Sequence, residues 1–394
     1  MLQNYFADLH IHIGANQHGS PVKITASREL NFANILHESA FYKGLDLIAV
    51  IDAASPLVIN DIERLLARGE MTELAEGGIK YRDRLVIILG AEVESREKNG
   101  GQVHYLAYFP DLAKIKEFSA IMTEYISNIN LSSQATGLTG AELLRIIDST
   151  GGLMVPAHAF TPHKGFYGRA FRVYTEAFSE EEWAMIPAIE LGLSADTYLA
   201  DYIPELSSKT FISNSDAHSL KKIGREYNRL QMKGVNFREF KLALLGRQQR
   251  SITANYGLDP RLGKYHRSYC QECDQGFGGD KPVDSCPHCR SKQLVIGVKD
   301  RILTISREKE SRSPELRPPY IHQVPLVDIP GIGPATLKKL LSNFGTEMDI
   351  IHRRGVDELK EIVGEKIAGN IARARSGEAI IKPGGGGIYG KVMG

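Results

Sequence analysis

Cysteine is missing from most of this 394-residue sequence, since none occurs before residue 270 or after residue 289. A disulfide-rich secreted scaffold is therefore excluded. The sequence also lacks any apolar run of the roughly 18 residues that cross a membrane, and it opens on a polar, histidine-bearing segment instead of a secretory signal. We expect a cytoplasmic protein, and the length predicts about two or three domains.

A strong net charge is also absent, because 48 Lys and Arg residues face 47 Asp and Glu residues. The distribution is nevertheless uneven: residues 261–394 carry 22 basic against 16 acidic side chains, and residues 1–260 carry 26 against 31. Bound cations would offset the negative charge of the acidic metal ligands in residues 1–260. The basic second part is typical of a phosphate-binding surface.

An acidic residue and two histidines, Asp8, His10 and His12, alternate along an apolar run near the N-terminus. Residues two apart on a β-strand share a face, so we expect these side chains to point into one site. Two imidazoles and a carboxylate suit a transition metal. Taken alone, the pattern also fits histidines that are solvated or satisfied by hydrogen bonds.

Further His, Asp and Glu residues each follow an apolar, β-branched run. Amphipathic stretches such as residues 141–149 separate the runs, which predicts the alternating strands and helices of a parallel α/β architecture. In barrels of that kind, polar residues at the C-terminal ends of strands converge on one mouth. Six strand ends deliver such residues, which indicates a polynuclear metal centre: Asp52, Glu92, His104, His158, Glu190, and Asp216 with His218.

This pattern resembles the polymerase and histidinol phosphatase (PHP) superfamily over residues 1–225: an opening His-x-His, then His18, Glu92, His104, His158 and a closing Asp-x-His. The resemblance implies an α/β fold with a distorted (β/α)7 barrel and two or three divalent metal ions, which could be Zn, Mn or Fe. Carried over by position, the first metal would be held by His10, His12, Glu92 and Asp216, the second by Glu92, His104 and His158, and the third by His18 and His218.

One departure from the superfamily concerns the third metal. The usual Thr-Asp-His after the second strand reads Ile51-Asp52-Ala53 here. Asp52 would then take the place of the missing imidazole, or the third metal would bind weakly.

The ligand set predicts a reaction. Closely spaced divalent ions lower the pKa of a bound water to about 7 and neutralise charge on a phosphoryl transition state. We therefore expect a phosphomonoesterase or phosphodiesterase with Asp8, Glu92 and Asp216 as catalytic carboxylates. The barrel alone does not choose between the two activities.

All four cysteines lie in two Cys-x-x-Cys pairs, Cys270 with Cys273 and Cys286 with Cys289. Four thiolates at this spacing are typical of a closed, structural zinc ribbon. Two disulfides are the alternative, and they would require an oxidising compartment.

Residues 326–341 contain an apolar lead-in, a Gly331-Ile332-Gly333 turn and a helix that is expected to begin at Pro334. Backbone N–H groups at such a helix start bind phosphate without reading a base. The stretch resembles the helix-hairpin-helix motif, and a weaker second copy spans residues 359–368. Ordinary helical turns are the alternative for both copies. The candidate DNA-binding residues are Gly331, Gly333, Lys338 and Lys339.

The order of these parts resembles the endonuclease Q family over essentially the whole chain. The resemblance implies a metal-dependent DNA repair endonuclease that cuts double-stranded DNA 5′ of deaminated bases (uracil, hypoxanthine, xanthine) and abasic sites, with base flipping. Replication or repair proteins are further candidate partners, and we expect no membrane partner. The expected parts are a PHP metallo-hydrolase barrel (1–258), a zinc ribbon (259–310), a linker (311–323), a helix-hairpin-helix module (324–382) and a flexible Gly-rich tail (383–394).

The segment after the His158 strand is a candidate base pocket or wedge, because it combines glycines, aromatic rings and cations. Its members are His163, Phe166, Tyr167, Arg169 and Phe171. A barrel loop with buried aromatic rings is the alternative.

Two other functions are compatible with parts of the sequence. A PHP phosphatase acting on a small phosphorylated metabolite would leave the ribbon and hairpin unexplained. A catalytically silent DNA-binding adaptor is supported only by Ala53 in place of the usual histidine.

Overall fold

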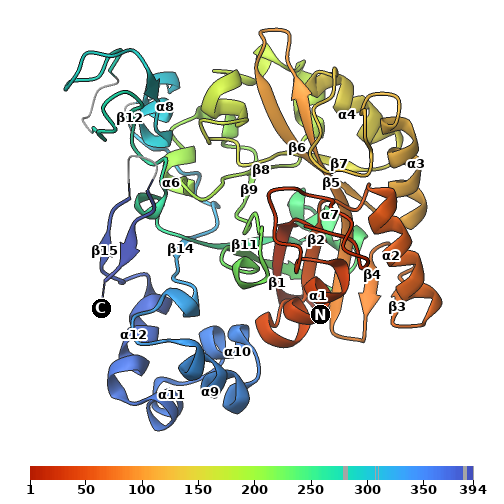
Figure 1. Ribbon diagram of the computed structural model, residues 1–394, viewed down its shortest axis with the longest axis vertical. Coiled ribbons are helices and arrows are strands. Elements are labelled where there is room, and N and C mark those ends of the chain that lie inside the picture. Colours follow the sequence, from red (N-terminus) through yellow and green to blue (C-terminus); the bar gives the residue numbers. More distant parts are fainter. Residues whose placement is uncertain (278–282, 307, 309, 385–387, 394) are drawn as a thin grey trace.

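The computed structural model describes residues 1–277, 283–306, 308, 310–384 and 388–393. Three parts are visible in Figure 1: a large α/β part on the right, a small cysteine-bearing part at the upper left and a helical bundle at the lower left. None of the helices in the described ranges has the length and apolar character needed to cross a membrane.

A mixed β-sheet forms the large part. Its strands are β1 (Gln3–Ile11), β2 (Leu47–Val50), β3 (Met71–Glu73), β4 (Ile79–Tyr81), β5 (Leu85–Arg96), β6 (Gln102–Phe109), β7 (Leu153–Pro156), β10 (Tyr227–Met232), β11 (Ser251–Gly257) and β14 (Tyr320–His322). The centre is parallel, with β2 between β1 and β5. The next strands outward, β10 beside β1 and β6 beside β5, run antiparallel to these neighbours.

A separate parallel pair, β8 (Ala188–Glu190) and β9 (Thr210–Ile212), closes the sheet into a barrel. Ala159 N–H, just after β7, donates to the Glu190 carbonyl at 2.8 Å, and the Asn255 side-chain amide of β11 donates to the Phe211 carbonyl at 2.9 Å. The predicted distorted barrel is confirmed. Its strands are not all parallel, because β5 and β6 form a hairpin with no helix between them.

Strand β2 is apolar along its whole length and buried on both faces, as is typical of a central parallel strand. Ile48 and Val50 of β2 pack into one hydrophobic cluster, and Leu47 and Ala49 pack into another. The flanking helices are α1 (Phe32–His37), α2 (Pro56–Ala67), α3 (Leu112–Met122), α4 (Gly140–Ser149), α5 (Glu180–Met185), α6 (Thr197–Ala200) and α7 (Phe237–Leu244). Short 3-10 or π-helical turns are η1 (Glu38–Lys43), η2 (Phe166–Ala170), η3 (Tyr174–Glu176), η4 (Pro204–Leu206), η5 (Leu220–Lys222), η6 (Pro260–Leu262) and η7 (Leu326–Asp328).

The cysteine-bearing part contains a two-stranded sheet of β12 (Tyr269–Cys270) and β13 (Leu294–Val295), followed by α8 (Val298–Ile305). Helix α8 attaches this part to the barrel. The Arg301 guanidinium donates to the carbonyls of Tyr167 and Phe171 at 2.9 and 3.0 Å.

The helical bundle has its own apolar core. Its helices are α9 (Pro334–Phe344), α10 (Glu347–His352), α11 (Val356–Val363) and α12 (Glu365–Ser376). The bundle packs firmly on the barrel: Lys43 Nζ donates to Glu347 Oε1 at 2.8 Å in a buried ion pair, and the His352 ring stacks on Phe6 with centroids 4.3 Å apart.

The C-terminal tail is folded where the structure describes it. Strand β15 (Ile381–Lys382) pairs antiparallel with β16 (Lys391–Val392), and Figure 1 shows β15 between the cysteine-bearing part and the bundle. Described residues of the expected Gly-rich tail (383–394) therefore take part in a strand pair, and the flexibility of the tail stays a prediction. Residues 385–387 and 394 lie outside the described residues.

Candidate active site

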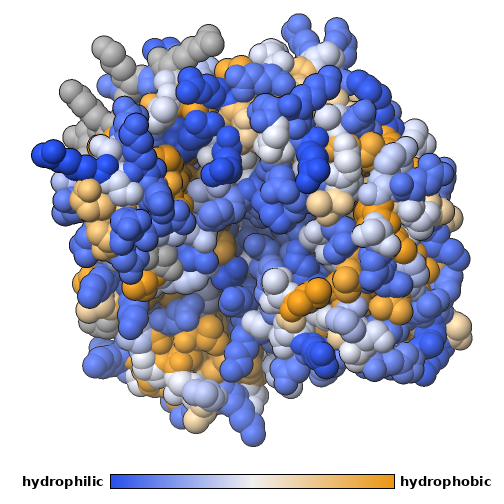
Figure 2. Space-filling model, turned by 45° about the horizontal axis from the view of Figure 1, so that its top comes forward, coloured by the Kyte–Doolittle hydropathy of each residue, from blue (hydrophilic) through white to orange (hydrophobic). Residues whose placement is uncertain are grey.

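A cavity of about 500 Å³ opens where β5, β6 and β8 meet the segments that follow β1, β7 and β9. Figure 2 shows a hollow with mostly hydrophilic walls near the middle of one face. The residues that line the cavity include six predicted metal ligands: His12, Glu92, His104, His158, Asp216 and His218. The ring of His10 lies below them and is fully buried.

The ligand atoms of these side chains converge in three groups, each with its atoms within 4.8 Å of one another. The groups are His10, His12 and Glu92; Glu92, His104 and His158; and His12, Asp216 and His218. Glu92 belongs to two groups, as expected of a carboxylate that bridges two metal ions.

His10 near the end of β1 and His12 just after it fit a metal ion. Their Nε2 atoms lie 3.3 Å apart, and each Nδ1 faces a carboxylate oxygen. If a metal ion displaced the protons from Nε2, each Nδ1 would donate to its carboxylate and both Nε2 lone pairs would face the ion. Because Zn–N distances are about 2.0–2.1 Å, two ligands of one ion lie roughly 3–3.5 Å apart, which matches this spacing.

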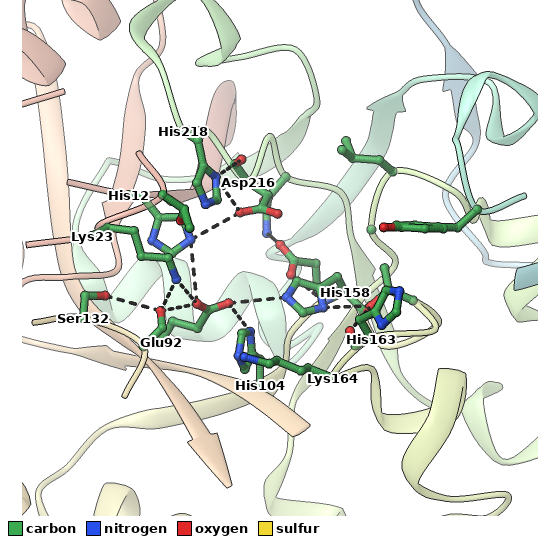
Figure 3. A pocket seen from close by; sticks show the side chains of 18 of the residues that line it. His12, Lys23, Glu92, His104, Ser132, His158, His163, Lys164, Asp216 and His218 are labelled. Carbon is green, nitrogen blue, oxygen red and sulfur yellow. Dashed lines mark hydrogen bonds and ion pairs between the residues drawn. The ribbon is translucent and has the colours of Figure 1, made fainter. Parts of the chain in front are cut away.

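Glu92 occupies the centre of the cluster (Figure 3). Its Oε1 lies 2.9 Å from Nδ1 of His104 and 3.4 Å from Nε2 of His158, and its Oε2 lies 3.0 Å from Nζ of Lys23. Despite the short distance, the buried Nδ1 of His104 has no hydrogen bond of normal geometry. A buried ring nitrogen that faces Glu92 without a hydrogen-bond partner fits a ligand of a metal ion shared with Glu92.

Two further carboxylates orient the histidines of the first group. Glu190 accepts from Nδ1 of His10 at 3.0 Å, and Asp52 accepts from Nδ1 of His12 at 3.1 Å and from Ile13 N–H at 2.6 Å. Such contacts fix the tautomer, so that Nε2 faces the metal. Asp52 is absent from the three ligand groups. Its role as a replacement ligand stays a prediction, whereas its observed contacts are those of a carboxylate that orients His12.

We expect Glu190→Gln to weaken metal affinity by about 10- to 100-fold, because the amide cannot hold His10 as a carboxylate does. The measurement is nicking activity against divalent-metal concentration, together with bound metal after dialysis. Glu226→Gln is a matched control: Glu226 is equally buried, but burial raises the pKa of its carboxyl to about 8, so it is already neutral near pH 7. Equal metal dependence in wild type and Glu190→Gln would contradict the orienting role.

Two ligands sit on backbone that is unusual for their residue type. His158 has a φ of 29° and Asp216 a φ of 46°, both in the left-handed region. Such conformations persist at functional sites where the surroundings impose them. Gly192 permits one of them, since a Cβ there would lie 2.9 Å from the His158 Cβ.

The carboxylates concentrate negative charge at the cluster. Burial disfavours a charged His10, yet the attraction of Glu190 and Asp216 outweighs it and raises the pKa of His10 to about 10. Burial lowers the pKa of His218 to about 4, so its ring is neutral and able to act as a ligand. The site therefore attracts cations, and divalent metal ions would compete with protons for the same nitrogens.

Comparison with known proteins decides between the possible phosphoesterases. The chain is 44% identical to the uncharacterised protein YqxK of Bacillus subtilis over 99% of this chain and 100% of that protein. It matches the crystal structure of the lesion-specific endonuclease PfuEndoQ from Pyrococcus furiosus with a TM-score of 0.84 and 32% identity, over 99% of this chain and 95% of that chain. The chain belongs to the endonuclease Q family. As a member of the endonuclease Q family it is a metal-dependent endonuclease.

A second endonuclease Q structure contains a 27-mer duplex substrate with an abasic lesion at the active site. It matches with a TM-score of 0.83 and 32% identity, over 99% of this chain and 96% of that chain. In addition, the family model described as SAM-like helix-hairpin-helix tandem matches residues 324–375. Both predicted hairpin copies lie in that range, so the module is confirmed.

Besides Asp52, two predicted residues of the metal site lie outside the ligand groups of this endonuclease Q family member. The Asp8 carboxylate is buried and accepts from Ser215 N–H at 3.1 Å and Gly224 N–H at 2.9 Å. It thus holds the loop that carries Asp216. His18 is exposed, and its Nε2 contacts the Arg64 guanidinium. Among the described residues, His18 takes no part in a group of metal ligands, and His218 joins His12 instead.

Several residues at the site were not predicted. Lys23 and Ser133 contact Glu92 Oε2, and Glu94 lies 3.3 Å from Nε2 of His104. Glu190 was visible as a strand-end carboxylate, but its orienting role was not. Lys23 and Ser133 lie in loops with no motif, so only the fold brings them to Glu92.

The candidate base-contacting segment is only partly available to a ligand. Phe166, Tyr167 and Phe171 are buried in the main hydrophobic cluster. The wedge prediction is therefore wrong for these three rings, because they pack the barrel loop. Arg169 is exposed and is not among the cavity residues, whereas His163 lines the cavity.

The four cysteines form one further group of ligand atoms within 4.8 Å of one another. Sγ of Cys270 lies 3.5 Å from that of Cys289, and Sγ of Cys273 lies 3.6 Å from that of Cys286. Four sulfur atoms about 2.3 Å from one zinc ion lie roughly 3.8 Å apart, so the geometry fits zinc. None of the four cysteines forms a disulfide in this structure, and the spacing of the sulfur atoms favours the zinc site.

The first hairpin has the geometry of a phosphate site. Gly331 has a φ of 93°, and Gly333 is the N-cap of α9, which begins at Pro334 as predicted. Lys338 is exposed on α9, whereas Lys339 Nζ donates to the Ile362 carbonyl near the second hairpin.

Proposed function

We propose that this chain hydrolyses the phosphodiester on the 5′ side of uracil, hypoxanthine, xanthine and abasic lesions in double-stranded DNA. The products would be a 3′-hydroxyl and a 5′-phosphate on the lesion. The observation that supports this most strongly is the set of ligand groups around Glu92 at the floor of a cavity, in a chain similar along its whole length to a lesion-specific endonuclease.

The residues assigned to metal are His10, His12, Glu92, His104, His158, Asp216 and His218, and they would hold two or three ions of Zn, Mn or Fe. When bound, such ions supply a hydroxide near neutral pH and neutralise phosphate charge. The cysteine group would hold one structural zinc.

The protein side chains bind and orient the substrate. Lys23 and Lys164 line the cavity and carry positive charge toward a bound phosphate. Glu92 contacts the His104 ring and would hold it in place, and Asp8 holds the loop that carries Asp216 by accepting from Ser215 N–H. Asp8 is thereby proposed to position Asp216, while Glu92 and Asp216 remain the catalytic carboxylates.

The size of the cavity supports extrusion of the damaged nucleotide. About 500 Å³ is within the usual range for a small-molecule site, and a duplex does not fit. A mismatched or deaminated base leaves the stack at lower cost than a normal base, which gives one source of selectivity.

The helix-hairpin-helix module is proposed to hold the duplex through its backbone. The parts of the chain would then be the barrel (1–258), the ribbon (259–310), the linker (311–323) and the module (324–382). The tandem motif supports the module, and its exposed hairpin glycines leave N–H groups available to phosphate.

We expect Lys338→Ala to weaken binding of damaged and undamaged duplexes equally, and to reduce the salt slope of binding by about 0.9 if one phosphate contact is lost. Fluorescence anisotropy over a salt series measures both quantities. Lys241→Ala, at an exposed lysine on α7, is the matched control. A selective loss for damaged duplexes would contradict sequence-independent contact.

The decisive experiment incubates the protein and a divalent metal with labelled duplexes that do or do not contain one deoxyuridine. A nick 5′ of the uracil supports the proposed function. Release of phosphate from small esters without nicking would support a metabolite phosphatase, and binding without turnover would support a DNA-binding adaptor.

A further inference from the structure

Two segments outside the barrel complete the rim of the active-site cavity. Lys264 and Tyr265 come from the first residues of the ribbon segment, ahead of β12, and Tyr389 comes from the C-terminal hairpin. All three line the same cavity as Glu92. The active site is therefore built in part by the last residues of the chain.

These three side chains form a layered group. Lys264 Nζ lies 4.7 Å from the centroid of the Tyr265 ring and 5.6 Å from that of Tyr389. On its other side, Tyr265 meets the His163 ring edge to face, with centroids 5.3 Å apart. Tyr265 is half-buried and fixed, whereas Tyr389 is 48% exposed at the rim.

The position of Tyr389 is set by backbone contacts. Gly384 N–H donates to the Arg261 carbonyl at 2.7 Å, and Gly390 N–H donates to the Leu262 carbonyl at 2.9 Å. A Cβ at residue 390 would lie only 2.5 Å from the Lys382 carbonyl oxygen, so a side chain there would displace the hairpin. Gly384 and Gly390 thus allow the hairpin to pack closely on residues 261 and 262. This packing places the exposed ring of Tyr389 at the opening of the active-site cavity.

We propose that Tyr389, supported by Lys264 and Tyr265, is the stacking surface for the base of the extruded lesion nucleotide, and that Lys264 contacts its phosphate. The proposal rests on the proposed function. An aromatic ring stacks on any base because every base has a π-face. Such a surface would accept both the pyrimidine and the purine lesions that are assigned above to one cavity.

The test compares deoxyuridine and abasic duplexes in the full-length protein. Tyr389→Leu should raise KM for the uracil substrate by about tenfold, equivalent to about 1.4 kcal/mol, and leave abasic cleavage within about twofold, because an abasic site has no base to stack. Tyr389→Phe should behave as wild type. Gly390→Val should reproduce Tyr389→Leu by displacing the hairpin.

Ile388→Ala is the matched control, since Ile388 is in the same hairpin, is 71% exposed and is not among the cavity residues. Equal losses on the uracil and abasic duplexes, or no loss on either, would overturn the assignment of Tyr389. Calorimetry measures binding of dUMP and of deoxyribose 5-phosphate, and it tests the stacking role of Tyr389 separately from the proposed endonuclease function. A preference of wild type for dUMP that Tyr389→Leu abolishes supports the stacking surface even if no duplex is nicked, and absence of that preference overturns it.

Discussion

Replacement of Glu92 by glutamine is expected to reduce nicking by about 10³-fold or more, because metal ions contribute several kcal/mol to phosphoryl transfer and each 1.4 kcal/mol is about tenfold in rate. The Glu92 carboxylate lies within 3.7 Å of four histidine rings. An amide keeps the shape of the side chain but removes the negative charge that two ligand groups share. The measurement is single-turnover nicking of a deoxyuridine duplex, with bound metal determined by elemental analysis.

Glu94→Gln is the control for this variant, since Glu94 lies on the same strand and contacts only the outer nitrogen of His104 among the ligands. We expect it to cost much less activity than Glu92→Gln. Retention of full metal content and activity by Glu92→Gln would refute the bridging role. An unchanged melting temperature would show that the fold is intact.

Replacement of Cys270 or Cys286 by serine is expected to unfold the ribbon. Both thiols are buried, and structural zinc binds zinc-finger peptides with an apparent free energy of about 10–16 kcal/mol, more than a part of this size can replace by packing. Zinc content should fall by one ion per chain, and a new low-temperature unfolding transition should precede that of the barrel. Calorimetry and elemental analysis measure these two changes.

His288→Ser is the matched control, because His288 is exposed and adjacent to the cysteines but outside their ligand group. It should leave the zinc content and the unfolding profile unchanged. If Cys270→Ser kept its zinc and its stability, the ribbon would not be a four-thiolate site.

The sequence indicated most of the residues that converge around Glu92, because each lies next to a recognisable apolar strand. His104 was predicted for a partly wrong reason: it starts β6 instead of ending a parallel strand. It reaches the site because β6 runs antiparallel to β5, which brings the beginning of one strand beside the end of the other.

Other features depend on contacts that no local pattern encodes. The aromatic rings of residues 166–171 have the composition of a base-binding loop, but burial among other apolar side chains is more favourable for them. Four consecutive glycines near the C-terminus are typical of a flexible tail, yet the first of them, Gly384, and the later Gly390 donate to carbonyls of η6, and Tyr389 lines the cavity. Only long-range contacts distinguish these cases.

The buried ion pair between Lys43 and Glu347 has a consequence for how the chain meets a duplex. Separating the two charges would leave one of them buried without a partner, at a cost of about 3–5 kcal/mol. The stacking of His352 on Phe6 adds to the same contact between the helical bundle and the barrel. These contacts oppose a movement of the helical bundle away from the barrel, and thus a change in the distance between its hairpins and the metal-ligand groups. If the hairpins and the active site bind one duplex together, incision requires intact double helix on one side of the lesion. The required length is set by the contact between the helical bundle and the barrel.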